Sequence, residues 1–92
     1  MAEARVKKSH NLGLAGVRER AQTAEKDLAE RYRATTSWKD ENTLAFARAG
    51  YKGNITLREN EVEFYVNLGL VGGLLKGKVE SKAKEILDRD FS

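Results

Sequence analysis

The chain has 92 residues, enough for one folded domain and too few for a second core of ordinary size. Cysteine is absent, which excludes disulfides, thiolate metal sites and thiol nucleophiles and favours the cytoplasm as the location. The 17 Lys and Arg residues and the 14 Asp and Glu residues leave a net charge of only +3, which gives weak support for an anionic partner such as nucleic acid.

The N-terminal third predicts a short edge strand and then a long amphipathic helix. Residues 4–8 alternate small or apolar side chains with charged ones, as an edge strand does. Apolar residues recur every three or four positions across residues 12–32, the period of a helix with one buried stripe: Leu14, Val17, Ala21, Ala24, Leu28 and Tyr32. Asn11 or Ser9 is positioned to cap the start of this helix. No apolar run follows the charged N-terminal residues, so we expect neither a signal peptide nor a membrane span.

Four strands are predicted next, at residues 35–39, 43–48, 53–58 and 61–68, separated by short turns rich in Asp, Asn and Gly. The last strand alternates regularly, so its two sets of side chains point to opposite faces of the sheet. The apolar set should enter the core: Val62, Phe64, Val66 and Leu68. The other set should be solvated: Glu61, Glu63, Tyr65 and Asn67.

A second helix is predicted over residues 73–90, where apolar residues again follow helical spacing: Leu75, Val79, Ala83, Ile86 and Leu87. A sheet with one apolar face needs helices laid across that face. We therefore predict a single α+β domain over residues 1–92. Its antiparallel sheet is a meander of four strands, or of five if residues 4–8 join it, with the N-terminal and C-terminal helices packed on one face.

No residue pattern predicts an enzyme. Residues 72–78 share the glycine and lysine positions of a phosphate-binding P-loop, but Val79 stands where a magnesium-binding hydroxyl is required. His10 is the only histidine and has no recognisable nucleophile or orienting partner, so a capping or packing role is favoured. One histidine with scattered carboxylates also gives no metal-ligand spacing. We expect no catalytic residue, no cofactor and no metal site.

The segment between the last strand and the second helix combines glycines with leucines, which suits neither a regular helix nor a solvated loop. An apolar contact surface is predicted at Leu70, Val71, Leu74 and Leu75, with a basic rim at Lys76 and Lys78. The alternative is that this segment is the buried start of a helix, because a domain of this size needs most of its leucines inside.

Three segments together resemble one bacterial family, the polyhydroxyalkanoic acid system proteins: His10 to Ala15, Gly50 to Leu57, and Leu68 to Leu70 followed by Lys76 to Glu80. The resemblance covers about residues 6–87, and it departs from the family pattern at Gly72 and Gly73, where more hydrophobic residues are expected. It implies an association with polyhydroxyalkanoate storage and brings no catalytic residues with it.

These observations predict a non-enzymatic accessory protein of polyhydroxyalkanoate metabolism. Its partner would be a granule surface, a granule protein or an acyl or lipid ligand, and its location would be the cytoplasm or the storage granules within it. The protein would be a monomer or a homodimer. By analogy with helix-grip lipid-binding proteins, the sheet and the C-terminal helix would enclose a small apolar cavity. That cavity would be lined by Phe46, Leu57, Phe64 and Val66.

Two alternatives stay open. The first is a small basic regulatory protein that binds nucleic acid through Lys7, Lys8, Arg18, Arg20 and the lysines of the second helix. It would gain support if the aromatic residues Trp38, Tyr51 and Tyr65 shared one exposed face for stacking on bases. The second is a dimerising interaction module whose exposed leucines meet those of a second copy.

Overall fold

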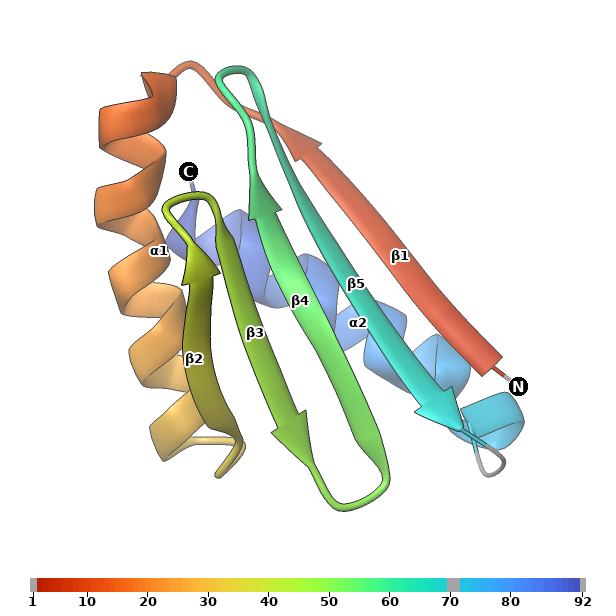
Figure 1. The fold of residues 1–92 in the computed structure, drawn as a ribbon. Helices are drawn as coiled ribbons and strands as arrows, with labels where there is room; N and C mark the ends of the chain where they lie inside the picture. The colour runs from red at the N-terminus through yellow and green to blue at the C-terminus, as the bar shows by residue number, and fades with distance from the viewer. Residues whose placement is uncertain (1, 70–71, 92) are drawn as a thin grey trace.

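The computed structural model describes residues 2–69 and 72–91, with side chains described for residues 3–69 and 76–91. The described residues form two helices and five strands, an α+β arrangement that confirms the predicted fold class and can be followed in Figure 1. The elements follow in the order β1 (Ala2–Ser9), α1 (Gly13–Glu30), β2 (Thr35–Asp40), β3 (Thr43–Arg48), β4 (Tyr51–Leu57), β5 (Glu61–Gly69) and α2 (Gly72–Asp90).

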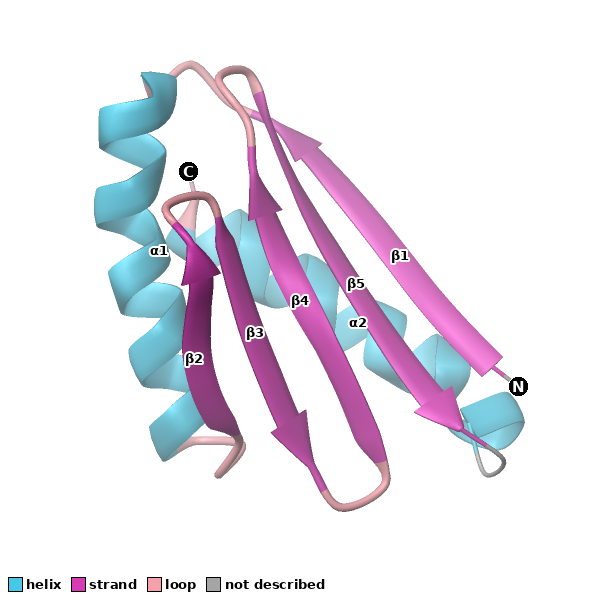
Figure 2. Cartoon of the chain, in the orientation of Figure 1, coloured by secondary structure: helices cyan, strands magenta, loops and turns pink. Residues whose placement is uncertain are grey.

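All five strands form one antiparallel sheet in the order β1-β5-β4-β3-β2 (Figure 2). Strands β2 to β5 make the expected meander. The N-terminal strand β1 joins it at the edge beside β5, with Val6 opposite Phe64 in the register. The five-stranded alternative is therefore the observed one, because the first strand of the chain, β1, pairs with the last strand of the meander, β5.

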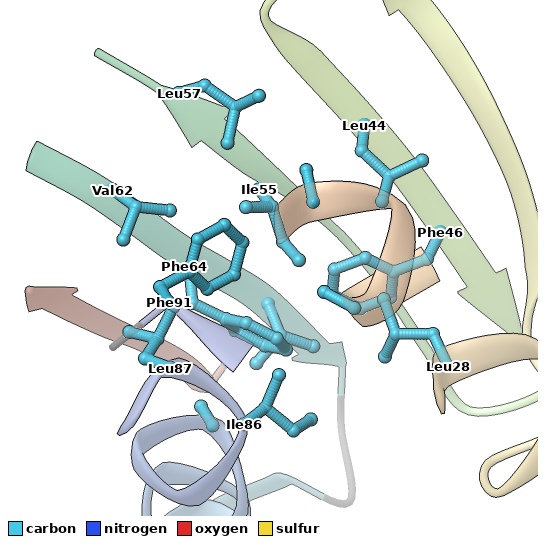
Figure 3. Close-up of a cluster of buried hydrophobic side chains, with 14 of the residues drawn as sticks. Leu28, Leu44, Phe46, Ile55, Leu57, Val62, Phe64, Ile86, Leu87 and Phe91 are labelled. Atoms are coloured by element: carbon cyan, nitrogen blue, oxygen red, sulfur yellow. The ribbon is translucent and has the colours of Figure 1, made fainter. Parts of the chain in front are cut away.

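Both helices cover the apolar face of the sheet. Helix α1 packs on β2 and β4, whereas α2 packs on β1 and β5 and crosses the sheet diagonally toward α1 (Figure 1). The predicted stripe of α1 is buried at Val17, Ala21, Ala24 and Leu28. Figure 3 shows the core between the layers, in which side chains of α2 meet those of the sheet. Burying each large apolar side chain of this core stabilises the fold by about 1.5–3 kcal/mol.

The start of α1 differs from the expectation. Its N-cap residue is Leu12, without a side-chain capping hydrogen bond, so neither Asn11 nor Ser9 caps the helix. The Leu12 backbone N–H instead donates to Nδ1 of His10 at 3.1 Å. Nε2 of the same ring lies 2.9 Å from the Arg58 carbonyl oxygen. His10 therefore carries its proton on Nε2 and joins the β1–α1 connection to the β4–β5 turn. Of the predicted capping or packing role, this is the packing role.

Candidate functional site

An apolar pocket of about 230 Å³ lies where α1 and α2 diverge over the sheet. The sheet contributes five side chains from β3, β4 and β5: Phe46, Tyr51, Phe64, Val66 and Leu68. The two helices contribute the rest: Leu28 from α1, Tyr32 just beyond its end, and Lys78, Val79, Lys82, Ala83 and Ile86 from α2. Aromatic rings and aliphatic carbons thus surround the interior, whereas Lys78 and Lys82 are exposed and Tyr32 and Tyr51 are half-buried.

Gly53 makes room for an aromatic ring that lines the pocket. It stands between Phe46 on β3 and Val66 on β5 in the sheet register. A Cβ atom at this position would lie 2.8 Å from Cζ of the Phe46 ring and would collide with the Tyr65 carbonyl oxygen. Because glycine has no side chain, the Phe46 ring can lie across β4, with its centroid 5.2 Å from that of Phe64.

The mouth of the pocket is basic. Lys78 and Lys82 are exposed and lie one helical turn apart, on the side of α2 that faces the pocket. The guanidinium of Arg48 donates to the Tyr32 carbonyl oxygen at 2.9 Å. Burial raises the pKa of the Tyr51 hydroxyl, and the charge of Arg48 partly opposes that rise. Among the described residues that line the pocket there is no carboxylate, so its field favours a negatively charged group.

The predicted cavity is confirmed in position and corrected in one lining residue. Phe46, Phe64 and Val66 line the pocket, as expected. Leu57 does not, although it is buried at 2% exposure. It lies at the opposite end of β4 from Tyr51, which does line the pocket.

The predicted leucine contact surface falls largely outside the described structure. Leu70 and Val71 lie outside the described residues, and Leu74 and Leu75 belong to α2 without described side chains. Both residues of the predicted basic rim, Lys76 and Lys78, are exposed, and Lys78 also lines the pocket. Granule contact through these leucines therefore stays a prediction.

Tyr32, Tyr51 and Lys82 are pocket residues that the sequence did not indicate. They come from three separate parts of the chain, so no local pattern joins them. The one available signal was the spacing of Lys82 four residues after Lys78, which puts both on one side of a helix.

Glu63 was expected in solvent, yet it is 7% exposed. Its carboxylate lies 3.3 Å from Arg5, 3.5 Å from Arg58 and 4.0 Å from Lys7, on the sheet face opposite the helices. The reason is the pairing of β1 with β5, which brings two cations of β1 beside this carboxylate. The outer face at this place is an ion-pair cluster rather than an open polar surface.

Three basic residues of the nucleic-acid alternative are engaged in ion pairs. Lys7 is paired with Glu63, Lys8 with Asp88 at 3.2 Å, and Arg18 with Glu41 at 3.3 Å. Arg20 is exposed on α1.

The aromatic residues of that alternative point in different directions. The Trp38 indole N–H donates to Glu25 of α1 at 3.2 Å, so Trp38 lies on the helix side of the sheet. Tyr51 lines the pocket, whereas the Tyr65 hydroxyl donates to Glu3 on the outer face. They offer no common platform for stacking on bases.

Several other sequence features have plain structural outcomes. The P-loop-like residues 72–78 lie within helix α2, so they form no loop in front of a helix. Within residues 2–69 and 72–91 no group of three His, Cys, Asp or Glu side chains is arranged to hold a metal ion. No helix of the described part of the chain combines the length and hydropathy needed to cross a bilayer.

Comparison with known proteins gives one family. No curated protein and no solved structure matches the chain. Residues 4–91 match the family described as putative polyhydroxyalkanoic acid system protein. The match extends across nearly all 92 residues and includes every strand and helix that lines the pocket. The chain therefore belongs to this polyhydroxyalkanoic acid system family.

Proposed function

We propose that this chain is a non-enzymatic accessory protein of a polyhydroxyalkanoate system that binds an acyl ligand in the pocket between its helices and its sheet. The proposed location is the cytoplasm, at or near the storage granules. The observation that carries the proposal is the apolar pocket of about 230 Å³, whose interior is formed by aliphatic and aromatic side chains from five elements. Membership of the family supplies the polymer context.

Hydrophobic transfer is the expected source of affinity. Each methylene group moved from water into such a site contributes about 0.8 kcal/mol. A short acyl chain would therefore gain several kcal/mol, part of which offsets the freedom that the ligand loses on binding. The inner residues of the pocket, such as Phe64, Val66 and Ile86, have no side-chain group for proton transfer or nucleophilic attack. A ligand-binding role suits this lining better than a catalytic one.

The test is to fill the pocket without disturbing the rest of the core. Val79 is half-buried and lines the pocket, so Val79→Phe would place a ring in the space that the ligand needs. Val6 is half-buried on β1 and does not line the pocket, so Val6→Phe is the matched control.

Binding of octanoate and of 1-octanol to the three proteins would be followed by isothermal titration calorimetry, with circular dichroism to show that each is folded. We expect the wild type and Val6→Phe to bind at least one of the two compounds and folded Val79→Phe to bind neither. Unchanged binding by folded Val79→Phe, or no binding by the wild type, would contradict the proposed site.

A further inference from the structure

The polar side chains of the pocket are its more exposed ones, since Lys78 and Lys82 are exposed and Tyr32 and Tyr51 are half-buried, whereas Phe46, Phe64 and Ile86 are buried. At the inner end, Phe46, Phe64 and Ile86 offer only carbon atoms to a ligand. A polar ligand group buried there would lose its hydrogen bonds with water and gain none from these side chains. The ligand must therefore enter with its hydrocarbon end first and leave its polar end between α2 and the end of α1.

Two lysines lie where that polar end of the ligand would be. Lys78 and Lys82 lie four residues apart on α2, and each covers part of the mouth with its aliphatic stem while its ammonium group stays in water. Lys78 forms no ion pair with any residue of the described part of the chain. Lys82 lies 3.7 Å from Glu85, but both side chains are more than half exposed, so this pair is weak and does not neutralise the mouth.

The volume limits the length of the hydrocarbon part. An engineered cavity of about 150 Å³ lined by Leu, Ile and Phe holds one benzene molecule, which has six carbon atoms. On that scale a pocket of about 230 Å³ takes a chain of about nine carbon atoms. A much longer chain would extend into water past the lysines and would gain little from its additional methylenes.

We infer that the pocket binds the free acid form of a medium-chain alkanoate, with its carboxylate between Lys78 and Lys82 and its chain against Phe46 and Phe64. This inference rests on the proposed function and adds the charge and the length of the ligand to it. The ligand is a carboxylate, supplied either by a simple fatty acid or by a hydroxyalkanoic acid released from polymer. A neutral alcohol or ester of the same length lacks the group that the mouth recognises.

The experiment compares ligands that differ only in the polar end. Calorimetry would measure octanoate, 3-hydroxyoctanoate and 1-octanol with the wild type at low and high salt. We expect at least one of the two acids to bind about tenfold or more tightly than the alcohol, because a charge-assisted contact is replaced by a neutral one. High salt should lower the affinity for the acid and leave the affinity for the alcohol unchanged. The comparison of the two acids identifies which source of carboxylate is preferred.

Two double variants of the same helix separate a specific contact from net charge. Lys78→Gln with Lys82→Gln removes both cations at the mouth, whereas Lys76→Gln with Lys84→Gln removes two exposed cations of α2 that do not line the pocket. The first variant should lose the preference for the acid, and the second should keep it.

Each remaining outcome has one meaning. Equal binding of acid and alcohol, with both abolished in Val79→Phe, would overturn the carboxylate inference and leave the acyl pocket intact. Equal loss of preference in the two lysine variants would also overturn it, since only the net charge would matter. Binding of neither class of ligand by the wild type would contradict the proposed function itself.

Discussion

Asp90 near the C-terminal end of α2 and Asp27 on α1 are joined by Arg89, which donates a hydrogen bond to each carboxyl group at the place where the two helices meet. Asp90 is 4% exposed, and within the described structure its Oδ2 atom has no hydrogen-bond donor. A proton shared between the two carboxyl groups would satisfy that oxygen, and hydrogen bonding between Asp90 and Asp27 is among the causes of their pKa shifts. Arg89 completes the junction by donating to Asp27 at 2.7 Å and to Asp90 at 3.3 Å.

The two carboxyl groups respond to pH in opposite directions. Burial and the neighbouring Asp27 raise the pKa of Asp90 from 3.8 to about 6. Burial alone would raise the pKa of Asp27 as well, but the hydrogen bond from Asp90 and the charge of Arg89 lower it below 3.8. Asp90 therefore stabilises the fold while protonated, fully so below pH 3.8, and this contribution is lost as the pH rises through about 6. The contribution of Asp27 is present above pH 3.8 and is lost as the pH falls.

Asp90→Asn should remove this pH dependence, because the Asn amide can donate to Asp27 without a titrating proton. We expect its free energy of unfolding to exceed that of the wild type at pH 7.5 by about 1–2 kcal/mol. Between pH 4 and 7 the wild type should lose stability and the variant should change little. Urea denaturation at a series of pH values measures both. Asp88→Asn, on the exposed side of the same helix, is the control and should keep the wild-type slope. A wild-type stability that rises from pH 5 to 7 would contradict the prediction.

Gly53→Ala should destabilise the fold by about 1–3 kcal/mol, the usual cost of forcing an extra methyl group into a packed position. The new Cβ would push the Phe46 ring toward the pocket, so ligand binding should fall together with stability. Gly77→Ala is the matched control, since a Cβ on that exposed helical glycine meets no atom within 4 Å. It should instead stabilise α2 by about 0.5–1 kcal/mol. Urea denaturation and calorimetry with octanoate measure both effects, and a neutral Gly53→Ala would show that β4 accommodates a side chain at this position.

Regular patterns in the sequence predicted the layers of the fold, because the spacing of apolar residues determines which face of a helix or strand is buried. The alternation from Val62 to Leu68 placed the apolar side chains of β5 in the core, and the stripe from Val17 to Leu28 placed α1 on the sheet. Each of these patterns depends only on neighbours along the chain.

Features that depend on distant segments were missed. Glu63 is buried because β1 brings Arg5 and Lys7 beside it from more than fifty positions earlier in the sequence. Tyr32 and Tyr51 line the pocket because the end of α1 reaches the start of β4. In each case the environment of a residue is determined by a strand or helix that is distant in the sequence, so the neighbouring residues in the chain do not predict it.

His10→Ala should cost about 1–3 kcal/mol of unfolding free energy, because a buried ring with two hydrogen bonds is lost. The Arg58 carbonyl oxygen and the Leu12 N–H would both lose their partner. Asn11→Ala tests the rejected capping role, since a true N-cap loses about 1 kcal/mol when it is replaced by alanine. We expect Asn11→Ala to be nearly neutral in urea denaturation. A larger loss for Asn11→Ala than for His10→Ala would mean that Asn11 caps α1 in solution.

Glu63→Gln should destabilise the outer edge of the sheet, because Arg5, Lys7 and Arg58 would lose the carboxylate that holds them together. The three cations are about half exposed, so water and salt screen their mutual repulsion. We expect a loss of about 1–2 kcal/mol in unfolding free energy at low ionic strength, since the carboxylate itself is nearly buried, and a smaller loss in 0.5 M salt, roughly half as large. Hydrogen exchange should show the loss first in β1, which lies at the edge of the described sheet and pairs there with β5. Glu61→Gln is the control, because Glu61 lies two residues earlier and is more exposed, and it should change stability and hydrogen exchange little. Equal effects of the two variants would show that the burial of Glu63 does not increase its contribution to stability.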